Sequence, residues 1–423
     1  MTREPGSGRA GGTAGGTAGV PGSHSRYSGV PGPRARRLQE ALAVVRERGR
    51  ASRGEIAQAL GLDKKTVSAL VGVLYAQSLV EGAGFRDSQA GRRQELLAVR
   101  GSHSCYLGID LGATHILGIL TDLNAAVLDR LYFEIRPGLP AELILSQLRS
   151  MARSLLASPR AVSPVRGLGI GVPGFVDPAQ GVSLVAENIP GWKDVRLREI
   201  LEDELGVPVE VDDCSRACGR AERWLGMGKE ERDFLLLDLG YGIGMALYLQ
   251  GGLYPGSRYK SGEIGHTVVK LDGPPCSCGK RGCLETVASG KGIACAAAAG
   301  IREGRSPVLS GLTHGNPEAV TAQDVSVAAS MGDVFAAGLL REAGGFIGVA
   351  LANAVNLLNP ALVVIGGGLA ASGELLLDSL REQLSRYAMM GIAEDLRLEL
   401  SGLGPDASAL GCALLAMERV FSP

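Results

Sequence analysis

Residues 262–285 read Gly-Glu-Ile-Gly-His266-Thr-Val-Val-Lys-Leu-Asp-Gly-Pro-Pro-Cys276-Ser-Cys278-Gly-Lys-Arg-Gly-Cys283-Leu-Glu285. Three cysteines fall within eight residues, and a histidine lies ten residues before the first of them. Three thiolates and one imidazole form the closed tetrahedral shell of a structural zinc ion. The alternative is a set of unliganded buried cysteines, but the neighbouring Gly and Pro residues provide no apolar core for them. We therefore predict one zinc ion per chain, bound by His266, Cys276, Cys278 and Cys283.

The bulk composition predicts a protein of two or three domains. At 423 residues the chain exceeds the size of one compact core, and 45% hydrophobic with 21% charged residues suits a globular fold. No apolar run reaches the roughly 18–20 residues of a membrane span. The N-terminal residues do not contain the apolar segment after a basic start that a secretory signal has. We expect a cytoplasmic protein without membrane contact.

The N-terminal part of the chain predicts a winged helix-turn-helix over residues 34–100. Residues 1–33 are rich in Gly, Pro, Ser and Thr and are predicted to be disordered. After them, helical periodicity and capping residues predict three helices, at 34–48, 52–60 and 64–77, with Ser52 and Asp63 as N-caps and Gly61 as a helix end. Short strands are expected at 79–80 and 95–99, joined by a glycine-bearing loop over 82–91. This order is that of a winged helix.

The charge of this segment favours nucleic acid as its partner. Residues 34–100 carry 13 Lys and Arg against 7 Asp and Glu, although the whole chain has a net charge of −1. A solvated basic face or a purely structural helical hairpin are the alternatives, but the wing and the N-terminal position favour DNA. We predict contacts to operator DNA from the third helix and the wing. The residues are Lys64, Lys65, Thr66, Ser68, Arg92 and Arg93.

After residue 101 the pattern becomes that of an α/β fold. A strand hairpin is expected at 106–109 and 116–121, followed by a helix at 141–157, a strand at 166–171 and a helix at 195–205. A second set follows, with strands at 234–238, 243–249 and 361–365 and helices from about 284, at 340–358 and at 373–387. Two α/β lobes around a cleft are the expected architecture.

This second part resembles the ROK family of bacterial repressors and sugar kinases over about 105–417. The resemblance rests on 262–285 and on further motifs, namely Gly108-Ile-Asp110-Leu-Gly112-Ala-Thr114, Gly171-Val-Pro-Gly174, Asn188-Ile-Pro-Gly-Trp192 and the stretch from Asn356 to Gly368. It implies a two-lobed, actin-like ATPase fold of the ribonuclease-H-like kind. The expected lobes are 101–226 and 227–423, with the last helix packed back on the first lobe.

The resemblance also implies a sugar site. The positions that match the family's sugar-binding residues are Asp213, Glu263, His266 and Glu285. Carboxylates suit neighbouring hydroxyl groups, and a zinc ion on one nitrogen of His266 would leave the other for the sugar.

The sequence departs from the kinase branch where phosphoryl transfer needs its base. The kinase motif Glu-Asn-Asp-Ala-Asn corresponds here to Asp212-Asp213-Cys214-Ser215-Arg216, so a thiol replaces the aspartate. A shift of one residue would make Asp213 the base, but the flanking motifs at 206–208 and 222–226 oppose it. The phosphate-binding turn Gly-Thr-Gly also carries a phenol, Tyr241, in its middle. We expect no catalysis and no ATP or magnesium cofactor.

Together these patterns predict a sugar-responsive transcription regulator, acting as a repressor. It would bind a two-fold operator as a homodimer or homotetramer, and the sugar would change the spacing of its DNA-binding domains. The main alternative is an ATP-dependent sugar kinase with a DNA-binding domain. A second alternative is a constitutive regulator with an unused cleft, although buried carboxylates lining an empty site would be costly.

Overall fold

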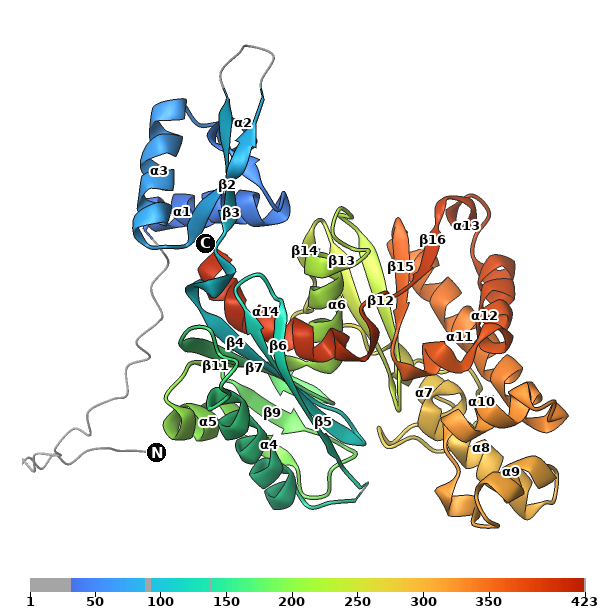
Figure 1. Ribbon diagram of the computed structural model, residues 1–423. Coiled ribbons are helices and arrows are strands. Elements are labelled where there is room, and N and C mark those ends of the chain that lie inside the picture. Colours follow the sequence, from blue (N-terminus) through green and yellow to red (C-terminus); the bar gives the residue numbers. More distant parts are fainter. Residues whose placement is uncertain (1–31, 88–92, 137, 422–423) are drawn as a thin grey trace, which may run out of the picture.

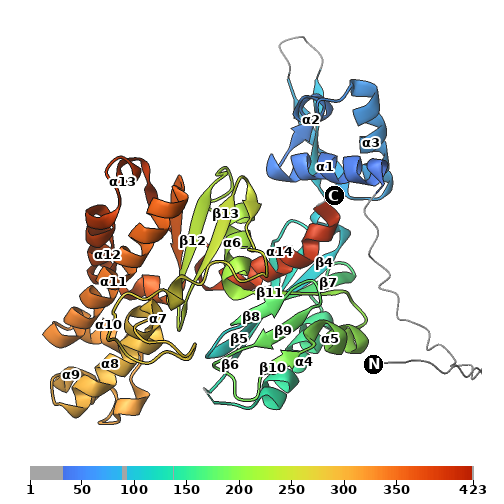
Figure 2. The same ribbon diagram turned by 180° about the vertical axis from the view of Figure 1, so that it is seen from behind.

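The computed structural model describes residues 32–87, 93–136 and 138–421. An N-terminal winged helix precedes two α/β lobes, so the predicted fold class is confirmed (Figures 1 and 2). In Figure 1 the winged helix lies above the first lobe, and the second lobe lies to the right.

The winged helix has the predicted order of elements. They are α1 (Pro33–Glu47), β1 (Ala51–Ser52), α2 (Arg53–Leu60), α3 (Lys64–Ala76), β2 (Val80–Arg86) and β3 (Gln94–Val99). The three strands pair in the order β1-β3-β2. The prediction of a loop from residue 82 was wrong at its start, because β2 continues to Arg86. A bulge between Gly82 and Phe85, with Gly84 at φ 97°, lets the glycine-rich segment remain paired with β3.

Local capping explains where helices α2 and α3 begin and end. Ser52 accepts a hydrogen bond from the Glu55 backbone N–H, and the Glu55 side chain accepts one from the Ser52 backbone N–H, as predicted. Gly61 ends α2 in the left-handed region at φ 63°. Asp63 then accepts from the backbone N–H groups of Lys65 and Thr66 and starts α3. The predicted caps are confirmed.

The first lobe is built on a five-stranded sheet of order β11-β7-β4-β5-β6. The predicted hairpin is confirmed as β4 and β5, while β7 and β11 lie parallel to β4. Helices α4 and α5 pack against this sheet, and a small sheet β10-β9-β8 lies beside it. The bounds are β4 (Cys105–Leu111), β5 (His115–Asp122), β6 (Val127–Glu134), α4 (Ala141–Leu156), β7 (Val165–Val172), β8 (Phe175–Asp177), β9 (Val182–Val185), β10 (Lys193–Val195), α5 (Leu197–Leu205), β11 (Val209–Asp213) and α6 (Cys214–Leu225).

The second lobe repeats this plan with a sheet of order β14-β13-β12-β15-β16. Its helices pack together in the largest hydrophobic core of the described residues. The bounds are β12 (Phe234–Leu239), β13 (Ile243–Leu249), β14 (Gly252–Leu253), η2 (Ile264–His266), α7 (Leu284–Ala288), α8 (Gly290–Arg302), α9 (Pro307–Leu312), α10 (Ala322–Ser330), α11 (Val334–Leu358), β15 (Leu362–Gly366), α12 (Glu374–Tyr387), α13 (Ile392–Asp395) and β16 (Arg397–Leu400).

Helix α11 is long and apolar enough to cross a membrane by length and composition alone. Its Leu340, Ile347, Leu351 and Val355 are fully buried, and it packs along α12. It is the central helix of the second-lobe core. It begins at Val334, six residues before the predicted start, because Asp333 caps it by accepting from the Ala336 backbone N–H.

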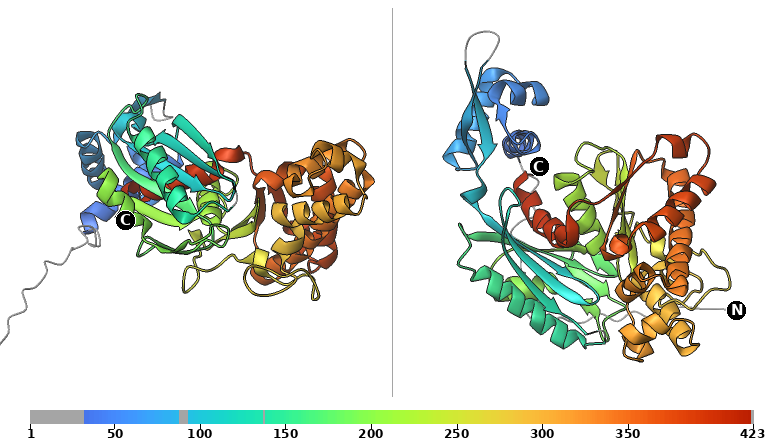
Figure 3. Two further views of the ribbon diagram at one scale, coloured as in Figure 1. Left: turned by 90° about the horizontal axis from the view of Figure 1, so that it is seen from below. Right: turned by 45° about the vertical axis from the view of Figure 1, so that its right-hand side comes forward.

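The last helix, α14 (Ala407–Phe421), leaves the second lobe and packs on the first-lobe sheet and on α6. The right panel of Figure 3 shows it lying between that sheet and the winged helix. Its residues Leu414, Met417 and Phe421 share one apolar cluster with Leu42 and Val45 of α1. Helix α14 therefore packs the winged helix against the first lobe.

Candidate functional site

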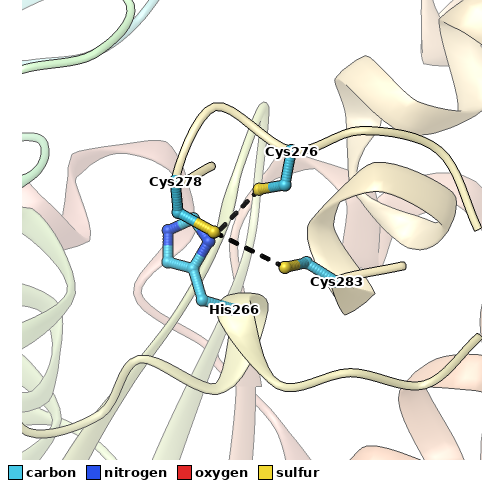
Figure 4. Close-up of side chains that lie close together, drawn as sticks. All are labelled: His266, Cys276, Cys278 and Cys283. Atoms are coloured by element: carbon cyan, nitrogen blue, oxygen red, sulfur yellow. Dashed lines mark hydrogen bonds between the residues drawn. The ribbon is translucent and has the colours of Figure 1, made fainter. Parts of the chain in front are cut away.

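The four predicted metal ligands converge on one point. Their ligand atoms lie within 4.8 Å of one another, as Figure 4 shows. The His266 Nδ1 atom is 3.5 Å from the Cys276 sulfur, and the Cys278 and Cys283 sulfurs are 3.7 Å apart. Such spacings are those of ligands around a tetrahedral ion with metal–sulfur bonds of about 2.3 Å. The group could hold a metal ion.

Glycines shape the loop that carries these ligands. Gly279 and Gly282 have φ angles of 85° and 68°, which other residues rarely adopt. A Cβ atom at Gly282 would lie 1.6 Å from the Lys270 carbonyl oxygen, so no side chain fits there. Backbone pairing of Val268 with Cys283 then closes the loop over η2.

The chemistry of the thiols suits a cation. Burial and the neighbouring Cys278 and Cys276 raise the pKa of the Cys283 thiol to about 12. The backbone hydrogen bond from Lys280 lowers the pKa of Cys278. A bound divalent ion stabilises thiolates in such a group and removes the mutual repulsion. The four ligands therefore suit a divalent metal ion.

His266 presents its two nitrogens to different neighbours. The Nδ1 atom faces the cysteines, whereas Nε2 lies 4.0 Å from the Glu263 Oε2 atom. The Glu285 carboxylate is held close by, where its Oε2 accepts a hydrogen bond of 3.4 Å from the Ile243 backbone N–H. The ring is therefore placed to bind a metal on one side and a polar ligand on the other.

Glu263 connects this group with the first lobe. Burial and the negative charges of Asp213 and Glu285 together raise its pKa to about 7, against the opposing effects of His266 and Arg216. These influences require all four groups to lie near Glu263. The structure thus brings the four residues of the predicted sugar site together. A carboxyl that is only partly ionised near neutral pH can both donate and accept hydrogen bonds to hydroxyl groups.

Asp213 has a structural contact as well. It is the N-cap of α6, where its Oδ1 accepts a 3.0 Å hydrogen bond from the Arg216 backbone N–H. Burial raises its pKa to about 6 against the opposing effect of Arg216.

Cys214 begins α6 beside Asp213. Its thiol donates a weak hydrogen bond to the Leu111 carbonyl oxygen at 3.6 Å. Burial and the charge of Asp110 raise the pKa of this thiol well above its usual range. The group at position 214 is therefore a neutral thiol, which cannot accept a proton as a carboxylate does.

Asp110 is engaged on both oxygens, a feature that the sequence did not reveal. Oδ1 accepts a 2.6 Å hydrogen bond from the Ser408 hydroxyl of α14, and Oδ2 lies 3.3 Å from His115 Nε2. Ser408 is 298 residues away along the chain. The only hint in the sequence was the position of Asp110 within a family motif.

A buried ionic chain runs from the interlobe region to α14 and was also missed. Arg216 donates to Asp212 at 2.6 Å, Arg220 donates to the same carboxylate at 3.2 Å, and Arg220 donates to Glu418 at 2.7 Å. Arg216 and Arg220 are 4% and 5% exposed. Removing one partner of such a buried ion pair strongly destabilises the fold, because the other charge stays buried and unpaired.

The turn around Tyr241, between β12 and β13, is held by helix α8 of the same lobe. The carbonyl oxygens of Gly240 and Tyr241 accept hydrogen bonds from the Gly290 and Lys291 backbone N–H groups, and the Lys291 ammonium lies 6.0 Å from the Tyr241 ring centre. The carbonyl groups of this turn are therefore bonded to α8, and the Tyr241 ring lies near the Lys291 ammonium.

Packing explains the glycine turn around Gly367, which follows β15. Gly367 has φ 87°, and a Cβ there would lie 2.3 Å from the Leu239 carbonyl oxygen and 2.6 Å from the Asp238 Oδ1. Burial, with Asp110 and Asp213 nearby, raises the pKa of Asp238 to about 7. Asp238 is a further acid of the interlobe region that the sequence analysis missed.

The predicted DNA-contacting residues lie on the surface of the winged helix. Lys64, Lys65, Thr66 and Ser68 are exposed on the first turns of α3. In the wing, Arg93 pairs with Asp87 at 3.2 Å. Arg92 lies outside the described residues.

The junction between the winged helix and α14 contains a partly buried cation. The Arg46 guanidinium of α1 lies 3.4 Å from the Trp224 ring centre and 5.2 Å from that of Phe421. Burial lowers the pKa of Arg46 to about 10, and Glu47 opposes this shift. Gln39 of α1 also donates a hydrogen bond to the Arg419 carbonyl oxygen.

Comparisons with known proteins match both parts of this arrangement. The model of the ROK family matches residues 106–419. The glucokinase of Halalkalibacterium halodurans is 34% identical over 316 residues, which cover 74% of this chain and 95% of the relative. The xylose repressor of Caldicellulosiruptor bescii is 30% identical over 372 residues, which cover 88% of this chain and 92% of the relative. A solved ROK family transcriptional regulator, a homologue of the E. coli MLC protein, superposes with a TM-score of 0.77 at 24% identity, covering 92% of this chain and 96% of its own.

Proposed function

The chain belongs to the ROK family, and from that premise we propose that it is a cytoplasmic, DNA-binding transcription repressor that senses a sugar or sugar derivative. The observation that carries the proposal is the extent of similarity. The match to a xylose repressor covers 88% of the chain, while the match to a glucokinase covers 74%. The N-terminal winged helix accounts for this difference in coverage, because a sugar kinase needs no such domain.

Operator DNA is the proposed partner of the winged helix. The exposed residues Lys64, Lys65, Thr66 and Ser68 on α3 would enter the major groove, and Arg93 in the wing would contact the backbone. Arg92 belongs to the same proposal by its sequence position. We expect a homodimer or homotetramer that reads a two-fold repeat.

A carbohydrate is the proposed effector. Asp213, Glu263, His266 and Glu285 offer carboxylate oxygens and one imidazole nitrogen, which suit a ring bearing several hydroxyl groups. A zinc ion held by His266, Cys276, Cys278 and Cys283 would fix the imidazole and the loop that carries it. The role of this ion is structural.

Phosphoryl transfer is not part of the proposal. The thiol of Cys214 supplies no base, and Asp110, whose oxygens are engaged by Ser408 and His115, is not free to hold magnesium. Tyr241 crowds the turn that would bind a phosphate. We propose that the chain is not an enzyme and uses neither ATP nor magnesium.

Helix α14 is the proposed link between sugar and DNA. At 15 residues it is about 22 Å long. Its Ser408 contacts Asp110 near the sugar residues, and its Phe421 contacts Arg46 of the winged helix. A sugar that binds one arrangement of the lobes more tightly would shift α14 and with it the position of α1.

The direct test is a titration of monosaccharides and amino sugars against the protein–DNA complex, with the DNA selected by the full chain from random duplexes. We expect one sugar class to change the DNA affinity at least about fivefold. No change with any sugar, while DNA binding and zinc content stay normal, would refute the sensing role.

The link through α14 has its own test. Arg46→Gln should leave sugar affinity unchanged and reduce the sugar's effect on DNA affinity about two- to fivefold, because a cation–π contact is worth roughly 0.5–2 kcal/mol. Arg48→Gln, at the end of the same helix but paired with Glu55, is the matched control. If the sugar changed the DNA affinity of Arg46→Gln as much as that of the wild type, α14 would not be the link between sugar and DNA.

A sugar kinase with a DNA-binding domain is the second candidate, favoured by the 34% identity to a glucokinase. The assay is ATP consumption with a panel of hexoses. Sustained turnover by the wild-type protein would establish this candidate over a pure regulator.

A further inference from the structure

The N-terminal turn of α1 lies beside the first turns of α3 and forms a basic groove. Arg34, Arg37, Thr66, Ala69 and Leu70 line this groove, which has a volume of about 310 Å³. No carboxylate is among its lining residues. The two arginines come from α1, whereas the DNA contacts predicted from the sequence lie on the third helix and the wing.

The positive charge of this turn is poorly compensated. Arg36 and Arg37 share one carboxylate, Glu40, at 3.2 and 2.9 Å. Within the residues that the structure describes, Arg34 has no acidic partner. The first turn of α1 has no acidic residue, although acidic side chains are favoured there, and at α3 the N-cap Asp63 is the acidic group, bonded to Lys65 and Thr66. The arrangement is electrostatically unfavourable for the isolated domain and favourable for a polyanion.

The arginines of α1 lie in two different environments, one packed and one exposed. Arg46, near the other end of the helix, is packed on Trp224 and serves the junction with α14. Arg37 has 49% of its side-chain surface exposed, and Arg34 is likewise exposed. The first turn therefore makes no packing contribution that would require arginine.

The floor of the groove is small and apolar. Ala69 is an exposed residue of α3 one turn after Lys65, and Leu70 is nearly buried. A strand of sugar-phosphate backbone can pass such a floor without steric conflict, with arginines on one side and the α3 residues on the other. The Thr66 hydroxyl is engaged as a donor to Asp63 at 2.6 Å, which leaves its lone pairs but no proton for a ligand.

We propose that Arg34 and Arg37 form a phosphate clamp that fixes α3 on duplex DNA. This clamp rests on the proposed DNA-binding function and adds two positioning residues to it. Phosphate contacts carry no sequence information, so the clamp sets the depth and angle at which α3 enters the groove. Guanidinium groups suit this task because they bind phosphate oxygens bidentately.

The test uses the full chain and two duplexes, one selected by the wild-type protein from a random pool and one of mixed sequence. In the double variant Arg34→Gln with Arg37→Gln, we expect the affinity for both duplexes to fall by the same factor, at least about fivefold, and the log–log salt slope to fall by about 2. Arg34→Lys with Arg37→Lys should restore much of the slope. Arg302→Gln with Arg305→Gln, exposed residues at the end of α8 in the second lobe, should change neither value.

The outcomes separate the clamp from the proposed function. An unchanged affinity and slope in the glutamine variant, with normal thermal unfolding, would overturn the clamp alone. A loss confined to the selected duplex would also overturn it, because it would indicate base recognition. Failure of the wild-type chain to bind either duplex would overturn the DNA-binding function itself.

Discussion

The two sides of the interlobe region differ in the chemical groups that their side chains offer. The zinc side, defined by Glu263, His266 and Glu285, keeps two carboxylates and an imidazole close together next to a complete set of metal ligands. The first-lobe side, defined by Asp110 and Cys214, has a neutral thiol and a carboxylate engaged on both oxygens. Hydroxyl recognition and proton removal need different groups, so one can persist while the other is lost. The difference supports a site that binds a sugar without reacting with it.

The largest expected effect comes from breaking the zinc side. Cys283→Ser removes a fully buried ligand from a four-ligand group, so zinc affinity should fall at least about 100-fold and the melting temperature by roughly 5–10 °C. Metal analysis and thermal unfolding measure both. Cys295→Ser, an exposed cysteine outside the group, is the control and should change neither. A full equivalent of zinc in Cys283→Ser would contradict the ligand assignment.

The next test sharpens the zinc side without touching the metal ligands. Glu263→Gln should lower the affinity for the effector about 10- to 100-fold, because a hydrogen bond to a charged group is worth roughly 1.5–3 kcal/mol. Calorimetry with the sugar found by titration measures this change. Zinc content and DNA affinity without sugar should stay the same, as they should in the control Glu303→Gln on the exposed end of α8. An unaltered sugar affinity would place the effector elsewhere.

Asp238, an interlobe acid on β12 of the second lobe, should affect the pH dependence of stability. Burial raises the pKa of Asp238 to about 7 from an ordinary 3.8, so the folded protein binds more protons than the unfolded chain between about pH 4 and 7. The contribution of this group to stability therefore falls as the pH rises through that window. Asp238→Asn should be more stable than the wild type at pH 8 by about 1–3 kcal/mol, with the difference vanishing towards pH 4.

Denaturant unfolding at several pH values measures this difference. Asp203→Asn, an exposed residue of α5, provides the control and should follow the wild type at every pH. If the stability of Asp238→Asn instead followed that of the wild type at every pH, Asp238 would be well solvated and its pKa would not be raised.

The smallest effect is expected at Cys214. Because its thiol makes only a weak hydrogen bond to the Leu111 carbonyl, Cys214→Ser should change sugar affinity by less than about twofold and should produce no ATP consumption. Calorimetry and a coupled ATP assay measure these values. A tenfold loss of sugar affinity would show that the first-lobe side takes part in recognition, and the comparison between the two sides would fail.

Local features of this protein were predictable from the sequence, and distant ones were not. The metal ligands lie within 18 residues, and the caps Ser52 and Asp63 act over three residues, so spacing alone located them. The contact of Ser408 with Asp110 and the bond of Arg220 to Glu418 join residues 298 and 198 positions apart. No local pattern contains such pairs, because they arise from the path of α14 across the first lobe.

Glycines caused the clearest errors in the elements. Gly82 and Gly84 suggested a loop, but a bulge allowed the strand to continue to Arg86. The start of α11 was missed because its first turns contain Ala336, Ala337 and Gly338, small residues that show no clear apolar period in the sequence, although Asp333 caps them. In both cases the pairing partner or the cap outweighed the local preference.

Helix α14 also determines the order in which the chain can mature. The apolar residues of the winged helix and of β4 and β5 share one core with α14, so this core cannot be completed until α14 has been synthesised. A chain that stopped before Ala407 would retain the second-lobe core yet leave Tyr106, Leu117 and Ile119 uncovered. Loss of α14 would therefore expose this apolar surface, and we expect such a truncated chain to aggregate.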